Sequence, residues 1–408
     1  MLRYLYEVIL LPMTRVLRII NRLNLGGPTF NVAYLTKYLA PEFETLLVSG
    51  MIDESEESSE YIAKELGIEP LYIPEMYRDI SLIHDRKAYK RIKKIIQEFK
   101  PDIVHTHAAK AGTLGRLAAI NCGVKNILHT FHGHVFHSYF GPLKTRMFLE
   151  IERYLAARST RIIAISERQK SELGLIYEVA PMEKIEVIPL GFNLEPFLEN
   201  QEEKRKKFRQ EYMVDDDEVV ISIIGRIVPV KNHKLFLNAL KILLENTNKK
   251  VRAFIVGDGE DRQLIEGYAS SLGIDFVSFV NEKRKAKLTF TSWKKDIDVV
   301  NAGSDIIALC SFNEGTPVSL IEAQAANRPI VTTRVGGITD VVIPEKTALI
   351  SSKMSVNNFA RNLLMLVEDE ERRLEMGNRG HDFVGTKFSY KRLIDDTAQL
   401  YRRLVASS

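Results

Sequence analysis

The sequence has little cysteine, no long apolar run and almost no excess of charge. Its 408 residues include only two cysteines, Cys122 and Cys310. Two cysteines cannot form a disulfide scaffold or a cysteine-rich metal site, and such scarcity is typical of the reducing cytoplasm. No apolar run reaches the roughly 18 residues that a membrane span needs. The formal net charge of +4, from 57 basic and 53 acidic residues, is no signature of nucleic-acid binding.

Strands and helices are predicted to alternate along nearly the whole chain. Buried strands such as 15–20 (R-V-L-R-I-I) are each followed by a loop and a segment with helical spacing. This β-α-β order predicts an α/β fold with parallel sheets covered by helices on both faces. The pattern restarts after 190–197, so we predict two doubly wound, Rossmann-like domains that face each other, 1–192 and 193–389. The last helix, 390–408, is expected to pack back on the first domain.

Two segments bear on contact with a membrane surface, and a third is predicted to be a basic helix. Residues 1–13 contain Glu7 and no small-residue cleavage site follows, so we interpret them as a leader before the first strand, with a short membrane-surface helix as the alternative. The run K-R-K-A-K, 283–287, is interpreted as a solvated loop, with contact to anionic lipid as the minor alternative. Residues 89–99 are predicted to form an amphipathic helix with a basic face.

The motif N-E-G-T-P-V-S-L-I-E-A, Asn313–Ala323, follows a buried strand. Ligands of doubly wound sheets bind at the carboxyl ends of the strands. Thr316 is expected to cap a helix beginning at Pro317, whose free N–H groups suit a phosphate. Glu314 precedes this helix and Glu322 lies two turns along it, so both carboxylates can bind sugar and ribose hydroxyls. A structural hydrogen bond explains Glu322 equally well, because a carboxylate on an apolar helix needs a donor.

The segment G-R-I-V-P-V-K-N-H, Gly225–His233, also follows a buried strand and opens a helix. Arg226 and Lys231 flank Pro229, so both can turn toward the crevice and bind a diphosphate through charge-assisted hydrogen bonds. The same cations would stabilise a departing nucleoside diphosphate, on which negative charge develops. The alternative is a pair of solvated loop cations.

Two weaker signals lie in the first predicted domain. Gly26 and Gly27 follow the first strand and allow close approach to a ligand, although G-x-G-x-x-G is absent. Six of the nine histidines gather at the ends of two strands: His105, His107, His129, His132, His134 and His137. Their spacing does not match a metal motif, and no carboxylate or cysteine is interleaved. We expect neutral imidazoles that bind sugar hydroxyls or phosphate, with a structural role as the alternative for the first three.

Together these residues resemble a family 4 glycosyltransferase, and the resemblance covers nearly the whole chain. S-F-N-E-G-T-P-V-S-L-I-E-A and R-P-I-V-T-T-R-V-G-G-I-T-D-V-V resemble the paired-glutamate motif and the glycine loop after it, and G-R-I-V-P-V-K-N resembles the diphosphate clamp. H-T-H-A-A-K-A-G-T-L-G-R-L-A-A and H-T-F-H-G-H-V-F-H resemble members that build capsule, O-antigen and exopolysaccharide. The resemblance implies the GT-B fold. Asn327 replaces a usual glycine, which asparagine can do because it tolerates a left-handed backbone.

The resemblance implies a role for each matched residue. His132 would lie near the reacting sugar, Glu314 would bind hydroxyls of that sugar, and Glu322 would hold the ribose. Arg226 and Lys231 would bind the diphosphate. The assignment is completed by Gly27, Gly315 and Thr316 at the phosphates, and less firmly by Lys110 and His134.

The implied reaction is retaining transfer from a nucleotide sugar, with UDP expected rather than GDP. We expect a front-face route, no metal and no other cofactor. The expected acceptor is a glycan or a polyprenyl-diphosphate-linked sugar. The protein is expected in the cytoplasm, with peripheral contact at the inner face of the membrane as a further option. Three alternatives are a nucleotide-sugar epimerase, a sugar phosphorylase and a non-catalytic binding protein. A nicotinamide-dependent dehydrogenase is disfavoured because its glycine fingerprint is missing.

Overall fold

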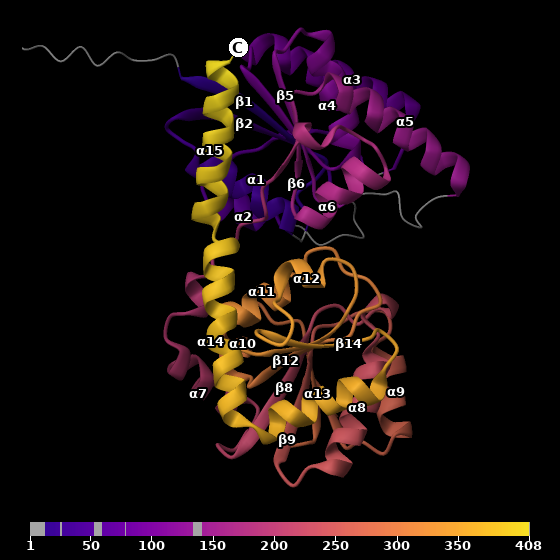
Figure 1. Cartoon of the computed structure of the whole chain (residues 1–408), viewed down its shortest axis with the longest axis vertical. Helices are drawn as coiled ribbons and strands as arrows, with labels where there is room; N and C mark the ends of the chain where they lie inside the picture. The colour runs from indigo at the N-terminus through magenta and orange to yellow at the C-terminus, as the bar shows by residue number, and fades with distance from the viewer. Residues whose placement is uncertain (1–12, 25–26, 53–58, 78, 134–140, 408) are drawn as a thin grey trace, which may run out of the picture. The chain divides into compact units, whose positions relative to one another are not determined.

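The chain divides into two compact units at the place where the sequence predicts the hinge. One unit comprises Met1–Phe192 with Tyr390–Ser408, and the other comprises Asn193–Ser389. Figure 1 shows the computed structural model, with the last helix in yellow. The structure describes residues 13–24, 27–52, 59–77, 79–133 and 141–407. The predicted leader, 1–13, lies almost wholly outside the described residues.

The first unit is built on a seven-stranded parallel sheet with the order β3-β2-β1-β4-β5-β6-β7. Its strands are β1 (Thr14–Ile20), β2 (Phe43–Gly50), β3 (Leu71–Ile73), β4 (Ile103–His107), β5 (Asn126–Phe131), β6 (Arg161–Ala164) and β7 (Ile185–Val187). All five residues of β4 are buried, and so are the last five of β1. Helices cover both faces of the sheet, which explains why these strands are continuous runs rather than alternating patterns.

The helices of the first unit are α1 (Gly27–Tyr38), α2 (Glu60–Glu65), α3 (Leu82–Phe99), α4 (Ala109–Asn121), α5 (Pro142–Arg158), α6 (Glu167–Ser171) and α15 (Tyr390–Ala406). Helix α3 begins well before residue 89, where its amphipathic spacing starts. Ser81 caps it by accepting a hydrogen bond from the N–H of His84 at 3.5 Å. Leu82 and Ile83, in its first turn, are exposed, so this turn carries no apolar pattern that would reveal it.

Helix α15 packs against the sheet of the first unit. Leu393, Leu400 and Tyr401 share a hydrophobic cluster with Val16 and Phe43. The packing agrees with the expectation for the end of the chain, because apolar residues at helical spacing cover one side of this helix. No helix in the described ranges combines the length and the apolar composition that crossing a bilayer requires.

The second unit repeats the architecture with a parallel sheet ordered β10-β11-β9-β8-β12-β13-β14. Its strands are β8 (Glu218–Ile224), β9 (Lys250–Val256), β10 (Phe276–Ser278), β11 (Leu288–Ser292), β12 (Ile306–Leu309), β13 (Ile330–Thr333) and β14 (Ala348–Ser351). Its helices are α7 (Gln201–Glu211), α8 (His233–Asn246), α9 (Arg262–Ser271), α10 (Ile297–Gly303), α11 (Val318–Ala325), α12 (Ile338–Val341), α13 (Val356–Glu368) and α14 (Glu370–Lys387).

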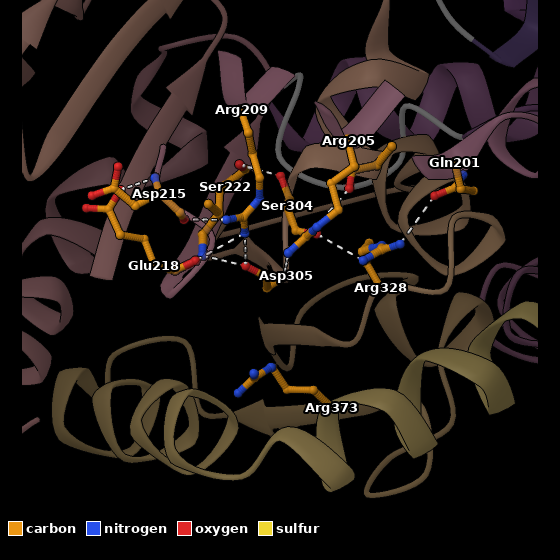
Figure 2. Close-up of polar contacts among 12 residues, drawn as sticks. Gln201, Arg205, Arg209, Asp215, Glu218, Ser222, Ser304, Asp305, Arg328 and Arg373 are labelled. Carbon is orange, nitrogen blue, oxygen red and sulfur yellow. Dashed lines mark hydrogen bonds and ion pairs between the residues drawn. The ribbon is translucent and has the colours of Figure 1, made fainter. Parts of the chain in front are cut away.

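Arginines converge on one carboxylate at the amino ends of β8 and β12 (Figure 2). Asp305 accepts hydrogen bonds from Arg205 at 2.7 Å, from Arg209 at 2.9 Å and from the N–H of Val220 at 2.7 Å. Arg328 donates to the carbonyl of the preceding Ser304 at 3.1 Å. These contacts tie α7 to two central strands. Because they lie at the amino ends of the strands, they leave the opposite, carboxyl edge for ligands.

Two local predictions around α11 have different outcomes. The helix begins at Val318 and not at Pro317. Pro317 occupies the capping position, so the predicted cap by the Thr316 side chain is wrong. Proline has a fixed backbone angle that suits either position, which makes the first helical residue hard to predict here. Asn327 adopts a left-handed conformation, with φ of +59°, which confirms that asparagine can serve where a glycine is usual.

Candidate active site

The strongest feature of the second unit is a direct contact between its two predicted ligand-binding loops. The Nζ atom of Lys231 lies 2.6 Å from Oε1 of Glu314, and the hydroxyl of Ser311 donates to the same oxygen at 2.6 Å. Lys231 follows β8 and Glu314 follows β12, and these strands are neighbours in the sheet. The structure therefore brings together a cation and a carboxylate that lie far apart in the sequence. Ser311 is the first residue of the motif S-F-N-E-G-T-P-V-S-L-I-E-A, but no role was predicted for it.

Arg226 lies on the same edge and is left free for an anion. Its side chain is exposed, and no hydrogen bond or ion pair joins it to any other residue in the described ranges. Gly225, immediately before it, has φ of +150°. A Cβ on Gly257 would lie only 2.0 Å from the carbonyl oxygen of Gly225, so the neighbouring loop also requires a glycine to approach this closely.

Gly336 and Gly337 hold the loop that carries Glu314 and Gly315. The N–H of Gly337 donates to the carbonyl of Glu314 at 2.9 Å. A Cβ on Gly336 would lie 1.8 Å from that same carbonyl oxygen, and a Cβ on Gly337 would lie 2.1 Å from the carbonyl oxygen of Gly315. The G-G pair of V-G-G-I-T-D is therefore the signal for a close loop–loop contact that spacing alone did not explain.

Gly315 and Thr316 lead directly into α11. The first N–H groups of this helix have no partner within the helix. Thr316 is partly exposed, and Gly315 has no atom within 4 Å of the position that a Cβ would take. Backbone donors here are open to a phosphate beside Arg226 and Lys231.

Glu322 lies on α11 without a hydrogen-bond donor among the described residues. The alternative that it makes a structural hydrogen bond is therefore not seen. Loss of water around the carboxylate raises the pKa of Glu322 to about 8, and the negative charge of Asp298 adds to this effect. A carboxylate in this state gains from a ligand that donates hydrogen bonds, as ribose hydroxyls do.

In the first unit, His132 follows β5 and bonds to His107 at the end of β4. The Nδ1 atom of His107 lies 3.0 Å from Nε2 of His132. Burial lowers the pKa of His132 to about 3, so its imidazole is neutral at physiological pH. A structural role was the alternative for His107 in the sequence, and its contact with His132 brings it to the candidate site.

The other described histidines of this cluster have structural partners. His105 bonds to Tyr401 at 2.6 Å and to Thr130 at 2.8 Å, and His129 bonds to Thr106 at 2.9 Å. Burial lowers the pKa of both imidazoles well below the usual value, so both are neutral. No group of three or more metal-ligating side chains forms in the part of the chain that the structure describes. His134 and His137 lie outside the described residues.

Two further predicted positions have a clear local setting. The amine of Lys110 lies 2.5 Å from Asp85 and also donates to the carbonyl of Asp79, so other parts of the first unit hold it. Gly27 begins α1 and is buried; a Cβ there would lie 2.9 Å from the side chain of Leu190. Gly26 lies outside the described residues.

Two doubly wound units, with cations and carboxylates at the carboxyl ends of strands in the second, have the architecture of a glycosyltransferase of the GT-B class. Comparison with known families agrees. The model described as Glycosyltransferase Family 4 matches residues 25–196, and the model described as Glycosyl transferases group 1 matches residues 204–383. These regions account for most of both units, and the chain belongs to the glycosyltransferases that the two models describe.

Individual relatives align with most of the length of this chain. The UDP-Gal:alpha-D-GlcNAc-diphosphoundecaprenol alpha-1,3-galactosyltransferase of Escherichia coli is 29% identical over 84% of this chain and 85% of its own. The capsular polysaccharide biosynthesis glycosyltransferase CapM of Staphylococcus aureus is 25% identical over 85% and 88%. The structure of Anabaena HepE in complex with UDP has the same fold, with a TM-score of 0.79, 17% identity and coverage of 96% of this chain and 100% of that one.

Proposed function

We propose that this glycosyltransferase uses a UDP-sugar and glycosylates a lipid-linked sugar or glycan during synthesis of a bacterial surface polysaccharide. The observation that carries the proposal is the carboxyl edge of the second unit, where Arg226 is free and Lys231 contacts Glu314 at 2.6 Å. Cations beside open backbone donors suit a diphosphate. The Escherichia coli relative is named for a UDP-sugar donor and a diphosphoundecaprenol-linked sugar, and the Anabaena protein binds UDP in its structure. Both support the choice of donor and acceptor.

Each residue has a proposed task. Arg226 and Lys231 bind the diphosphate with the N–H groups of Gly315 and Thr316, and Glu322 accepts hydrogen bonds from the ribose. Glu314 binds the sugar. Because Glu314 also contacts Lys231, its carboxylate would lie next to the departing phosphate. The two cations then take the role that a metal ion has in other nucleotide-sugar enzymes, and we propose that none is needed.

The proposed reaction proceeds at the front face of the sugar. The bond between the anomeric carbon and the diphosphate oxygen breaks, and a bond from the acceptor oxygen to the same face of that carbon forms. The departing phosphate oxygen takes the proton of the acceptor hydroxyl, so the configuration is retained. His132 is proposed to donate or accept a hydrogen bond at the transferred sugar.

The test is transfer to a defined acceptor. Purified protein is incubated with undecaprenyl-diphosphate N-acetylglucosamine and, one at a time, UDP-galactose, UDP-glucose, UDP-N-acetylglucosamine and GDP-mannose, with and without a chelator. The expected result is one UDP-sugar converted to an α-linked product, identified by mass and by the anomeric proton coupling, with no loss when the chelator is present. A β-linked product overturns retention, and dependence on a metal overturns the role of the cations.

The same assay separates the alternatives. Conversion of the donor to another nucleotide sugar without a glycosylated acceptor indicates an epimerase. Release of a sugar 1-phosphate from an added glycan, dependent on inorganic phosphate, indicates a phosphorylase. Binding of UDP without turnover across all acceptors indicates a binding protein.

We also propose peripheral contact with an anionic membrane, because the acceptor is lipid-linked. One face of α3 supports this proposal. Leu82 and Ile83 are 87% and 71% exposed, and Ile80 just before them is 66% exposed. The residues that follow on the same helical face are cations: Arg86, Lys87, Lys90, Lys93 and Lys94. An apolar tip followed by cations is typical of segments that bind the surface of anionic lipid.

This face is a better candidate than the basic run 283–287. Lys285 pairs with Asp215 at 2.5 Å and with Glu218 at 3.0 Å, and Arg284 pairs with Asp275 at 2.9 Å. On α3, only Lys94 of those five cations has an ion pair among the described residues, with Glu98 at 3.6 Å. More of the positive charge of α3 is therefore available to phosphate headgroups.

Co-sedimentation with vesicles tests the membrane contact. Binding to vesicles of phosphatidylcholine with phosphatidylglycerol, but not of phosphatidylcholine alone, is expected. The double variants L82S/I83S and K87E/K90E should each reduce binding at least about fivefold, since each cation near the surface contributes about 1 kcal/mol. The control K206E reverses an exposed cation on α7 and should bind as the parent protein does. Equal binding by all variants contradicts the proposal.

A further inference from the structure

His107 and His132 are joined by one hydrogen bond that lies close to the plane of both rings. The bond length is 3.0 Å, the ring planes differ by 24° and the ring centroids are 5.3 Å apart. Rings stacked face to face would have a shorter centroid separation. Rings that meet edge to edge through a hydrogen bond between two ring nitrogens have the longer separation seen here. The side chain of His107 therefore fixes both the position and the plane of His132.

The hydrogen bond also couples the tautomers of the two rings, because the tautomer of one ring determines that of the other. Both imidazoles are neutral, because burial lowers the pKa of each. Each neutral ring carries one proton, and one of the two protons lies in the shared bond. The other must lie on an outer nitrogen, either Nε2 of His107 or Nδ1 of His132. Both of these atoms are buried and have no hydrogen-bond partner among the described residues.

The surroundings of His107 favour one of the two arrangements. Its charged and titratable neighbours are Arg18, His105 and His129, beside His132, and the positive charge of Arg18 contributes to lowering its pKa. Ala109, two residues later, begins α4, whose amino end adds positive potential. Positive potential favours a lone pair over an N–H group on the outer edge of His107. The proton of His107 then lies on Nδ1 and is donated to His132.

The ring of His107 lies beside the ring of His105, which is itself held by hydrogen bonds. Arg18 donates a hydrogen bond to the hydroxyl of Tyr401 at 2.9 Å. The Tyr401 hydroxyl therefore donates its own proton to Nδ1 of His105, and the proton of His105 lies on Nε2, where it is donated to Thr130. The ring of His105, fixed in this way, lies 4.3 Å from that of His107. The next residue, Ala108, has φ of +65° and ψ of 159°, a conformation that only glycine adopts without strain, so the backbone directly after His107 is strained.

We propose that His107 is a positioning residue that holds His132 as the tautomer with its proton on Nδ1, ready to donate to an oxygen of the substrate. Only one part of this inference rests on the proposed function, namely that His132 contacts the substrate. A residue that fixes the tautomer and orientation of an active-site histidine can have a large effect on turnover without touching the substrate. The sequence left a structural role open for His107, because nothing in H-T-H shows which ring it will meet.

Imidazole ¹⁵N spectroscopy of the protein alone tests the tautomer. The expected signals for His132 are a protonated Nδ1 and an unprotonated Nε2. In H107L the shared bond is lost, and we expect a large fraction of His132 to carry its proton on Nε2 instead. H107N keeps a donor close to the position of Nδ1 and should restore the parent pattern. The control H129N alters an equally buried histidine that bonds to Thr106 and should leave His132 unchanged.

Kinetics then test the consequence. H107L should reduce kcat at least about tenfold, leave the Kd for UDP within about twofold of the parent value and shift the pH profile of kcat, whereas H107N should recover most of kcat. Thermal unfolding establishes that each variant is folded. A His132 protonated on Nε2 in the parent protein, or full activity in a folded H107L, overturns the inference. The expected tautomer in a protein that transfers no sugar would contradict the proposed function and leave the pairing intact.

Discussion

Lys231 donates to Glu314 across a distance of 2.6 Å, so the cation that is proposed to bind the diphosphate already has a carboxylate partner in the ligand-free protein. The side chains are 23% and 11% exposed, so water screens this contact only partly. In the proposed site, an incoming diphosphate would have to share Lys231 with Glu314, whereas Arg226 would meet no such competition. The two cations are therefore not equivalent, although they lie in one motif.

The first prediction concerns Glu314. In E314Q the ion pair is lost, Lys231 is free and one negative charge leaves the phosphate site. We expect UDP to bind about threefold to tenfold more tightly, as the loss of a partly buried competing charge implies. The transfer rate should fall, because the amide is a poorer acceptor for the hydroxyls of the sugar. Isothermal titration and steady-state kinetics measure the two effects, and E211Q, which breaks a 2.9 Å pair with Lys294, is the control. Weaker UDP binding in E314Q would contradict the competition.

The second prediction concerns Arg226. Its guanidinium has no protein partner in the described ranges, so R226A removes a ligand contact without leaving a buried group unpaired. Loss of a charge-assisted hydrogen bond of about 1.5–3 kcal/mol should weaken UDP binding about 10- to 100-fold. The thermal midpoint should remain within about 1 °C of the parent value, and K206A should change neither property. Unchanged UDP binding would exclude Arg226 from the diphosphate site.

The sequence predicted the fold well where its signals were local and strong. Continuous apolar runs identified the central strands, and the interruption around G-F-N identified the division between the units. The start of α3 was missed, because Leu82 and Ile83 are exposed and give no apolar spacing. The start of α11 was placed one residue early, because proline suits both the capping position and the first position of a helix.

The candidate site was predictable to the level of motifs but not of contacts. Motif spacing indicated Arg226, Lys231 and Glu314. Their pairing depends on β8 and β12 being adjacent, and a non-consecutive strand order is not written in any local pattern. The contact of His107 with His132 instead follows from the pairing of the consecutive strands β4 and β5, and the sequence did gather these histidines at the ends of two successive strands. It could not show which ring nitrogens would meet, because that depends on side-chain orientation.

The third prediction concerns pH and Glu322. Its pKa is raised from an ordinary value of 4.5 to about 8 in the ligand-free protein. Ribose hydroxyls that donate to the carboxylate favour its ionised form, so nucleotide binding should release a proton. The affinity for UDP should therefore rise as the pH increases toward 8. Titrations at pH 7 in buffers with different ionisation heats measure the proton release, and E322Q should show none from this site. Equal proton release by E322Q would place the titration elsewhere.

The fourth prediction concerns how the side chain of Glu322 affects the stability of the folded protein. The folded protein keeps a proton on Glu322 that the unfolded chain gives up above pH 4.5, so the contribution of this group to stability is lost as the pH rises from 4.5 toward 8. E322Q cannot lose a proton. It should therefore unfold at a higher temperature than the parent protein at pH 8 and at a similar temperature near pH 4.5, while binding UDP less tightly. A lower thermal midpoint for E322Q at pH 8 would show that the carboxylate has a stabilising partner.

The fifth prediction concerns Asp305, which organises the amino edge of the second sheet. Arg209 is only 6% exposed and donates to Asp305 together with Arg205, so D305A leaves a buried guanidinium without its counterion (Figure 2). Breaking one side of a buried pair costs about 3–5 kcal/mol, and the urea midpoint of the second unit should fall accordingly. D217A is the matched control, because Asp217 and Lys250 pair at 2.6 Å while both are about 60% exposed, and its effect should stay below about 1 kcal/mol. UDP binding measured in the absence of urea should persist in D305A, since the network lies at the edge of the sheet opposite to Arg226 and Lys231. Similar losses in the two variants would show that water, and not Asp305, solvates Arg209.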